Sequence, residues 1–410
     1  MRIIFVGDLQ YATAEEENLG FKMEQLRSLK PDLAVVMGDI GGSHMGSFEG
    51  FDETKRYVDM LGCPYEVILG NHDVEYSPYE PDVFDFEKTF HEVFTGHDLF
   101  TVKAADGVLY ICVSCEHRPP EDFRTHNAVF VSDGQFAKII EALERHPDMP
   151  AVLVTHAPLA GSGVRRWLPL HCAATDYYMD QTFNTERWLR LLKDYPQIRM
   201  SVSAHLHMSH EYDSAITFRE GIVHVSCGAM TICARDDIQQ TRVMDADRGR
   251  AVIYTFDHAS GVFRKDAEYS FAPGSVPLGR VAFPEKDEMP IGFDEIYAVY
   301  RLEEKGRYFF ATKNGLLWDY EPALMEFTGA LLLRGGAQAM SFDGSRLYIK
   351  KFSGEIYSLD PDSSGRYDRK GAHMPQEIVP ETEMRGSPLP TAEYAVRKAK
   401  DGTHVRITEI

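Results

Sequence analysis

The sequence predicts an α/β fold over residues 1–270, followed by a smaller β-rich domain over residues 271–410. In the first part, short apolar runs alternate with helical patterns, which is typical of strands joined by crossover helices. Segments rich in Pro and Gly lie near residue 271, and beyond them only short strand-like runs between Gly and Asp turns occur. A chain of 410 residues is long enough for two such domains.

The first strand is predicted by the run MRIIFVGD, which ends in polar residues. Residues 16–29 carry leucines and a methionine at helical spacing, and Pro31 ends this helix before the next strand, DLAVVMGD. Residues Glu53–Leu61 predict a second helix. A third strand and its loop follow in YEVILGNHD.

The remainder of the α/β part continues the same alternation. Residues 108–114 predict a strand, and Ser132 followed by Asp133 predicts the start of a helix. A further strand that leads into a loop is predicted by AVLVTHAP. Residues 184–193 predict a helix, and the strand IRMSVSAHLH follows it. After this strand we expect only short strands, in GIVHVSC, AVIYTFD and VFRKDAEYSF.

The C-terminal part contains one recognisable local motif. The runs SRLYIK and GEIYSLD predict a hairpin of the kind found in a propeller blade. No repeat period extends far enough for a whole propeller. We therefore expect residues 271–410 to form a β-rich accessory domain rather than part of a catalytic site.

Composition excludes several classes of function. The formal net charge of −20 opposes tight nonspecific binding to nucleic-acid polymers or anionic membranes. Cys112 and Cys115 form a lone C-x-x-C pair, which does not support a structural zinc site, so we expect six reduced thiols. Met1 leads directly into a strand, and no apolar run reaches the roughly 18 residues of a membrane helix. We therefore expect a cytoplasmic protein.

Polar side chains of metal-ligand type follow five of the predicted strands, where each strand ends. In an open sheet, ligands bind outside the carboxyl ends of the strands, so we expect these side chains to converge. Carboxylate, amide oxygen and imidazole suit manganese, iron or zinc. The residues are Asp8 and Gln10, Asp39, Asn71 and His72, His156, and His205 and His207.

This set of ligands favours two metal ions. Two divalent ions roughly 3.5–4 Å apart need a shared ligand, which an Asp carboxylate can provide. One bridging Asp with several neutral ligands leaves the pair positively charged, so that it attracts phosphate and lowers the pKa of a bridging water. The sequence therefore predicts a hydrolase of phosphate esters or anhydrides that uses a metal-bridging hydroxide.

The order of the motifs resembles that of the calcineurin-like metallophosphoesterases. The family pattern is D-x-H, GD, GNH followed by D or E, a lone His, and GH-x-H. The resemblance covers residues 1–270 and implies a four-layer α-β-β-α sandwich with two divalent ions. In this chain the pattern appears as Asp8-Leu9-Gln10, Gly38-Asp39, Gly70-Asn71-His72-Asp73, His156 and Ala204-His205-Leu206-His207.

The resemblance also implies a role for each of these residues. His72 would contact phosphate and protonate the leaving group, and Asp73 would orient His72. Asp39 would bridge the two ions. One ion would be held by Asp8, Gln10, Asp39 and His207, and the other by Asp39, Asn71, His156 and His205.

Two residues depart from the family pattern. Gln10 replaces the usual His, and its amide oxygen is a weaker ligand than imidazole. Ala204 replaces Gly, which costs little where φ is negative. The run DLQYA is similar to that of manganese-dependent ADP-ribose and CDP-alcohol diphosphatases, and this D-x-Q variant is also similar to class III cyclic nucleotide phosphodiesterases. Mn²⁺ is therefore the expected metal, with Fe or Zn as alternatives.

The substrate is less clearly encoded. Arg165 and Arg166 can bind a distal phosphate, and Tyr177 and Tyr178 can stack on a base, although local packing explains these residues equally well. We expect a phosphodiester or phosphoanhydride in a small, nucleotide-like substrate. The alternatives are a phosphomonoesterase or protein phosphatase of the same fold and, less favoured, a catalytically inactive binding scaffold. A scaffold would lose the His72 equivalent and several ligands, which this chain keeps.

Overall fold

We describe the fold from a computed structural model of the chain. Contacts divide the chain into two compact units, one formed by the described residues up to Pro284 and the other by those from Glu288 onward. The residues described are 1–10, 16–42, 45–74, 85–116, 129–159, 161–164, 185–234, 236–284, 288–292, 296–313, 315–322, 326–333, 336–361, 378–399 and 402–408.

Two β-sheets form the centre of the first unit. The strands of one sheet are β1 (Arg2–Val6), β2 (Leu33–Val36), β3 (Tyr65–Val67), β10 (Gln240–Asp247), β11 (Arg250–Asp257), β12 (Phe263–Ser270) and β13 (Leu278–Gly279). Those of the other are β4 (Phe100–Ala105), β5 (Val108–Val113), β6 (Ala151–Thr155), β7 (Ile198–Ser203), β8 (Ile216–Arg219) and β9 (Ile222–Ser226). Their orders are β13-β12-β11-β10-β1-β2-β3 and β4-β5-β6-β7-β9-β8.

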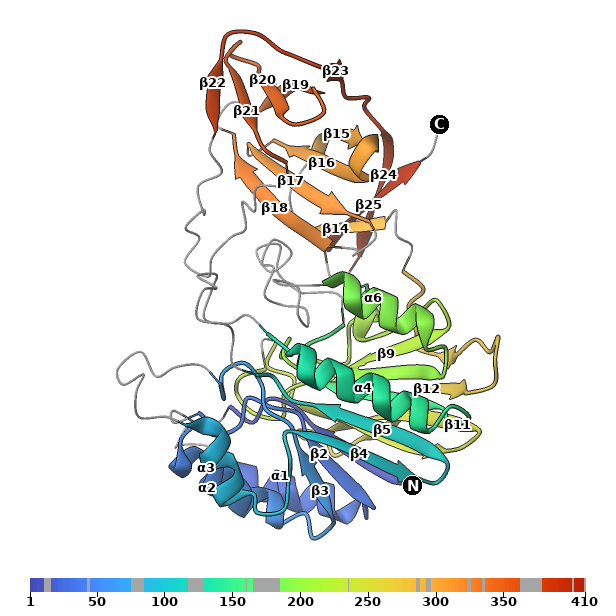
Figure 1. Ribbon diagram of the computed structural model, residues 1–410. Helices are drawn as coiled ribbons and strands as arrows, with labels where there is room; N and C mark the ends of the chain where they lie inside the picture. The colour runs from blue at the N-terminus through green and yellow to red at the C-terminus, as the bar shows by residue number, and fades with distance from the viewer. Residues whose placement is uncertain are drawn as a thin grey trace. The chain divides into compact units, whose positions relative to one another are not determined.

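Parallel strands occupy the part of each sheet that carries the predicted ligands. β1, β2 and β3 are parallel neighbours, and so are β5, β6, β7 and β9. Helices connect many of these strands, and Figure 1 shows α4 and α6 on the second sheet and α1 to α3 beside β2 and β3. The helices are α1 (Glu16–Ser28), α2 (Phe48–Asp59), α3 (Phe86–Val93), α4 (Asp133–Arg145) and α6 (Thr185–Asp194), with a short 3₁₀ turn, η3 (Asp213–Ala215).

The alternation of side chains along β1 explains the layering. Ile3 and Phe5 belong to the buried cluster between the two sheets, which includes Val152 of β6. Ile4 and Val6 point the other way and pack in the cluster that contains residues of α1, such as Leu19. A sheet that buries both faces in this way needs helices outside and a second sheet inside. The predicted α-β-β-α sandwich is therefore confirmed.

Antiparallel sheets make up the second unit. A four-stranded sheet has the order β15-β16-β17-β18, a five-stranded sheet β22-β21-β20-β19-β23, and a three-stranded sheet β14-β25-β24. The predicted hairpin is confirmed, because β20 pairs antiparallel with β21. The elements are β14 (Glu288–Gly292), β15 (Ile296–Leu302), η4 (Glu303–Lys305), β16 (Arg307–Thr312), β17 (Leu316–Glu321), β18 (Glu326–Leu332), β19 (Ala337–Phe342), β20 (Leu347–Lys351), β21 (Ile356–Leu359), β22 (Val379–Glu381), β23 (Ser387–Pro388), β24 (Glu393–Ala399) and β25 (Gly402–Thr408).

Several local predictions differ from the structure. The second helix begins at Phe48 rather than Glu53, because Ser47 caps it by accepting a hydrogen bond from the backbone N–H of Gly50. The helix α3 and the strand β4 were not expected, since α3 has eight residues and only Phe90 and Val93 are buried on it. By contrast, Ser132 does cap α4 as predicted.

Two further observations bear on expectations from composition. None of the helices in the described part of the chain is long and apolar enough to cross a membrane. The cysteines within the described residues are free thiols, at positions 63, 112, 115, 227 and 233, and Cys172 lies outside the described residues.

Candidate metal centre

The predicted ligands lie on five loops that follow parallel strands. Asp8 and Gln10 follow β1, Asp39 follows β2, and Asn71 follows β3 in the first sheet. In the second sheet His156 directly follows β6, and the residues at 205 and 207 follow β7. The carboxyl ends of parallel strands thus bring residues from both sheets together, as expected.

Two groups of side chains have the geometry of a metal site. In the first, the ligand atoms of Asp39, His156 and His205 lie within 4.8 Å of one another. In the second, those of Asp8, Asp39 and His207 do so. All five residues are buried, with at most 7% of their surface exposed. Asp39 belongs to both groups, which is the position a bridging carboxylate requires.

His156 Nε2 lies at the centre of the first group. It is 3.4 Å from Asp39 Oδ2, 3.1 Å from His205 Nδ1 and 3.2 Å from Asn71 Oδ1. A neutral imidazole nitrogen cannot satisfy all three of these atoms, because at least two of them are acceptors. A cation bound among these four atoms would interact favourably with all of them, so this set of donor atoms fits a metal ion.

The second group has a similar arrangement. His207 Nε2 lies 3.1 Å from Asp8 Oδ1. This oxygen is buried, and no donor among the described residues is oriented to form a hydrogen bond with it. Gln10 Nε2 donates to Asp39 Oδ2 at 2.9 Å. An amide flip exchanges the nitrogen and oxygen of Gln10, so the same side chain can present its oxygen to a cation.

Backbone carbonyls orient two of the histidines. His156 Nδ1 donates to the Met37 carbonyl at 2.7 Å, and His207 Nδ1 donates to the Cys233 carbonyl at 3.2 Å. Each bond places the proton on Nδ1 and directs the lone pair of Nε2 into the site. Sequence reasoning missed both carbonyls, because every residue carries one and no side chain marks these two.

Strained backbone supports the same assignment. Asp8, Asp39, His205 and His207 have φ angles of 41°, 52°, 67° and 53°. This left-handed region is costly for residues other than Gly, by about 1–3 kcal/mol each. Half of the described non-glycine residues with positive φ are therefore candidate ligands. Ala204 is not among these residues, so the condition for its replacement of Gly is met.

Gly70 allows two of the loops to approach each other. A Cβ atom at this position would lie 2.2 Å from Asp39 Oδ1 and 2.7 Å from Cε1 of His156. No side chain fits such a space, so the Gly of the GNHD motif is required by packing against the candidate ligands. Gly38, with φ of 92°, lies against Gly70 for the same reason.

Asp73 binds the backbone of two loops that carry candidate ligands. Its carboxylate accepts hydrogen bonds from the backbone N–H groups of Asp39, Ile40 and Gly70, at 2.8, 2.9 and 2.7 Å. The observed bonds hold the loops after β2 and β3 together, because buried backbone N–H groups there need acceptors. The resemblance implies in addition that Asp73 orients His72, and this role stays a prediction.

His72 lies at the edge of the site. Its side chain is 18% exposed, whereas that of Asp39 is 1% exposed, and its Nε2 lies 4.0 Å from Asp39 Oδ2. The backbone N–H of His72 donates to Asp39 Oδ1 at 2.9 Å. The ring is thus close to the carboxylate that both groups share while remaining accessible to solvent.

The charges of the site are matched to cations. Although burial opposes it, the interaction with His156 lowers the pKa of Asp39, so this carboxylate stays ionised. Burial likewise opposes protonation of His156, but the Asp39 carboxylate raises the pKa of His156 to about 9. Without a metal ion, protons on histidine balance the buried carboxylates. A divalent ion can replace these protons, which is the behaviour expected of a metal site.

The predicted substrate contacts at Arg165, Arg166, Tyr177 and Tyr178 lie outside the described residues.

Sequence reasoning also missed Thr231, whose hydroxyl donates to the Gln10 carbonyl at 3.0 Å. Thr231 is far from Gln10 in sequence, and no spacing rule connects these two residues.

Comparisons with known proteins gave one family match and several similar solved structures. A model of the calcineurin-like phosphoesterase family matches residues 1–209. A search of curated proteins found no match. The solved structures found include a dimetal phosphatase from Danio rerio, which is 14% identical with a TM-score of 0.45 and covers 65% of this chain and 98% of its own. Another is zinc-bound Vps29 from Entamoeba histolytica, which is 11% identical with a TM-score of 0.32 and covers 66% of this chain and 100% of its own.

The family match accounts for the order of the motifs and for the two groups of candidate ligands. It covers residues 1–209 of the 410-residue chain, which is just over half. The protein is a metal-dependent phosphoesterase that belongs to the calcineurin-like phosphoesterase family.

Proposed function

We propose that this chain hydrolyses a phosphodiester or phosphoanhydride bond in a small, nucleotide-like substrate. The observation that carries the proposal is the position of Asp39 in both groups of candidate ligands. A single carboxylate shared by two cation sites is the arrangement that two-metal phosphoryl hydrolysis uses.

Each residue of the centre has a role in this proposal. One ion is held by Asp8, Gln10, Asp39 and His207, and the other by Asp39, Asn71, His156 and His205. Together, the bound ions supply positive charge to the phosphoryl group and lower the pKa of the attacking water. The Met37 and Cys233 carbonyls keep two of the histidines in the tautomer that presents Nε2.

His72 acts on the substrate side of the centre in this proposal. Its partial exposure and its position beside Asp39 support contact with phosphate rather than with metal. As an imidazolium, it can donate a proton from Nε2 to the leaving oxygen, and the same proton stabilises phosphoryl charge before transfer. Asp73 supports this role indirectly, because it fixes the loop on which His72 lies.

The substrate class is the least constrained part of the proposal. Its support is the DLQYA run, which is similar to that of manganese-dependent ADP-ribose and CDP-alcohol diphosphatases. We therefore propose Mn²⁺ as the metal. Arg165 and Arg166 for a distal phosphate, and Tyr177 and Tyr178 for a base, remain proposals from the sequence. The same holds for the assignment of residues 271–410 to an accessory domain.

A substrate screen with matched variants tests the function. Bis-p-nitrophenyl phosphate, p-nitrophenyl phosphate, cyclic nucleotides and nucleoside diphosphate derivatives are compared with Mn²⁺, Fe²⁺ and Zn²⁺. We expect diester or anhydride turnover with two metal ions per chain, and loss of both turnover and metal in Asp39→Asn. Asp52→Asn, on the exposed side of α2, is the control. Higher kcat/KM for monoesters would favour the phosphomonoesterase alternative, and full activity in Asp39→Asn would refute the centre.

A further inference from the structure

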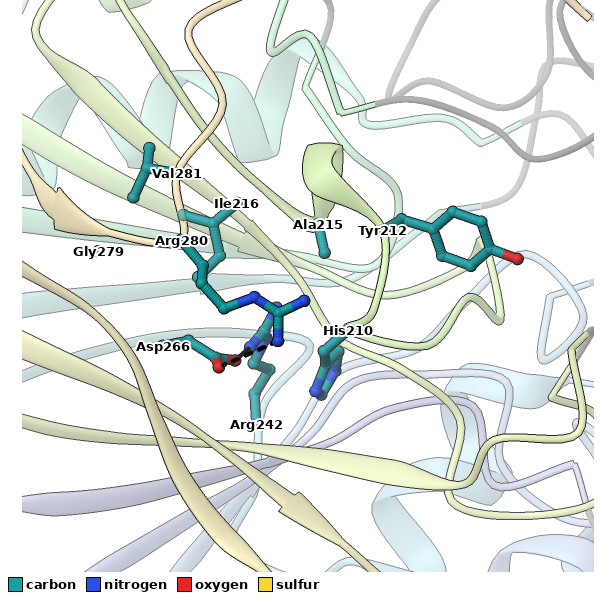
Figure 2. Close-up of a pocket in the computed structure, with 9 residues that line it drawn as sticks. All are labelled: His210, Tyr212, Ala215, Ile216, Arg242, Asp266, Gly279, Arg280 and Val281. Carbon is teal, nitrogen blue, oxygen red and sulfur yellow. Dashed lines mark hydrogen bonds and ion pairs between the residues drawn. The ribbon is translucent and has the colours of Figure 1, made fainter. Parts of the chain in front are cut away.

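A polar cavity lies in the first unit, among residues that carry none of the family motifs. It has a volume of about 180 Å³ and is bounded by β8, β10, β12 and the segment that follows β13. Figure 2 shows Arg242, Arg280, Asp266 and His210 around it. His210 is not part of the family motifs, and the proposed hydrolysis does not use this cavity.

Positive charge exceeds negative charge around the cavity. Three arginines, Arg242, Arg264 and Arg280, surround two carboxylates, Asp266 and Glu211. Burial and the neighbouring arginines hold the pKa of His210 well below its usual range, so this ring is neutral at pH 7. The cluster therefore carries one net positive charge, which a bound monoanion would neutralise.

The acceptors of the cluster are already in use. Asp266 Oδ2 accepts from Arg242 Nη1 at 2.6 Å and from the Thr255 hydroxyl, and its Oδ1 accepts from Arg264 Nε at 2.7 Å. His210 Nε2 accepts from the Gly228 N–H at 2.7 Å, which leaves its Nδ1 to donate to Thr255 Oγ1 at 3.0 Å. The lone pairs nearest to the cavity are thus occupied by donors.

Two buried guanidinium nitrogens of the cluster, Nη2 of Arg242 and Nη2 of Arg264, have no acceptor among the described residues, and of these two arginines Arg242 lines the cavity. Arg242 is 1% exposed, its Nε donates to the Ser226 carbonyl and its Nη1 donates to Thr255 and Asp266. Its Nη2 is buried and has no hydrogen-bond partner among the described residues. A buried guanidinium nitrogen without an acceptor is costly, so an acceptor is expected beside it.

The backbone fixes Arg280 at the cavity. The N–H of Arg280 donates to the Asp266 carbonyl at 2.7 Å. Gly279 has φ of 109°, and a Cβ there would lie 2.2 Å from the same carbonyl oxygen, so only Gly allows this approach. Arg280 is 43% exposed and lies beside the buried Arg242, which leaves one arginine accessible to an arriving ligand and one fully desolvated.

We propose that this cavity binds a small tetrahedral oxyanion, such as phosphate, between Arg242 Nη2 and Arg280. An oxyanion supplies the acceptor that Arg242 lacks and the negative charge that the cluster lacks, and arginine is well suited to bind it. The ligand is free phosphate or a second phosphoryl group of a substrate. The proposal does not depend on catalytic activity, since it concerns binding alone.

The test measures phosphate binding to the full-length, metal-loaded chain by calorimetry. We expect two phosphate ions per wild-type chain, one at the metal centre and one at the cavity. Arg280→Gln should weaken one of the two by about tenfold or more, because it removes a charge-assisted hydrogen bond. Arg250→Gln, an exposed arginine that is paired with Glu268 in the same sheet, is the matched control and should bind both ions normally.

A second measurement locates the ion. Crystals soaked in tungstate should show an anomalous peak for tungsten in the cavity, with a tungstate oxygen within hydrogen-bonding distance of Arg242 Nη2. A raised KM of Arg280→Gln for diphosphate substrates alone would assign the site to a substrate phosphoryl group, whereas unchanged KM values with loss of binding would assign it to free phosphate. Phosphate binding unchanged by Arg280→Gln, together with no tungstate peak at the cavity, would overturn the proposal.

Discussion

The Asp73 carboxylate accepts a hydrogen bond of 2.8 Å from the backbone N–H of Asp39. Through the same oxygen it accepts a bond of 2.7 Å from Gly70. The residue that both candidate ligand groups share is therefore held in its left-handed conformation by a buried carboxylate on the neighbouring loop. This relationship makes Asp73 a support of the centre rather than a ligand.

Asp73→Asn should destabilise the protein and weaken metal binding together. The substitution replaces one acceptor oxygen with an NH₂ group that faces buried N–H donors, so we expect a loss of about 2–4 kcal/mol in the free energy of unfolding. Thermal unfolding and metal content measure the two effects. Asp85→Asn is the control, because Asn caps a helix as well as Asp does. Unchanged stability and metal content would remove this role from Asp73.

Gln10 variants should change the metal dependence of activity. If the amide oxygen completes one metal site, Gln10→Ala raises the Mn²⁺ concentration at half-maximal activity, by roughly tenfold. Gln10→His should stay active, because imidazole is the ligand that relatives carry at this position, and its metal preference should shift. Titration of activity with Mn²⁺ and Zn²⁺ measures both. Identical metal curves for the two variants and the wild type would show that Gln10 is not a ligand.

His72→Asn should retain both metal ions. Its loss of rate should be larger for substrates whose leaving group needs a proton. General acid catalysis is worth about 10²–10⁴-fold for a poor leaving group and much less for nitrophenolate. We therefore expect a large loss of kcat on an alkoxide-leaving ester and a small loss on a nitrophenyl ester. Equal losses would indicate that His72 positions phosphate instead. Loss of metal would make it a ligand.

His258 should make the protein sensitive to mild acid. It is buried between Thr241 and Gln25, and burial with the nearby Lys22 lowers its pKa to about 3. Between pH 6.5 and 3 the unfolded chain binds a proton that the native protein does not, so stability falls as pH falls, by about 1.4 kcal/mol per pH unit. Urea unfolding of His258→Gln should show a smaller decrease in the free energy of unfolding as the pH falls below 6.5. His91→Gln, at an exposed position on α3, is the control, and parallel curves for all three proteins would contradict this prediction.

A chain that ends after Pro284 should still form the metal centre. The strand β13 pairs with β12, and the Ala282 N–H donates to the Ile216 carbonyl at 2.9 Å, so a cut near residue 271 would remove part of the first unit. A cut after Pro284 keeps these contacts. Metal analysis and unfolding of the purified fragment test the expectation. A folded fragment without metal would show that the C-terminal part contributes to the centre.

Local pattern was sufficient for much of the fold and for the ligand types. Apolar periodicity depends only on neighbours in sequence, so it located β1, β2, β6 and β7 and placed Asp8, Asp39, His156 and His207 at their carboxyl ends. It missed α3 and β4, whose apolar residues are too few or only half-buried to give a clear period.

The sequence by itself thus determined the positions of several strands along the chain, the chemical types of the ligands and the likeness to a metallophosphoesterase. Tertiary structure alone decided that Asp73 accepts hydrogen bonds from the backbone of two loops, that the Met37 and Cys233 carbonyls orient two of the histidines, and that Arg242 and Arg280 share a cavity. The physical reason is that these relationships join strands and loops that are far apart along the chain. Their distances depend on how the two sheets twist and pack, and no local spacing encodes that.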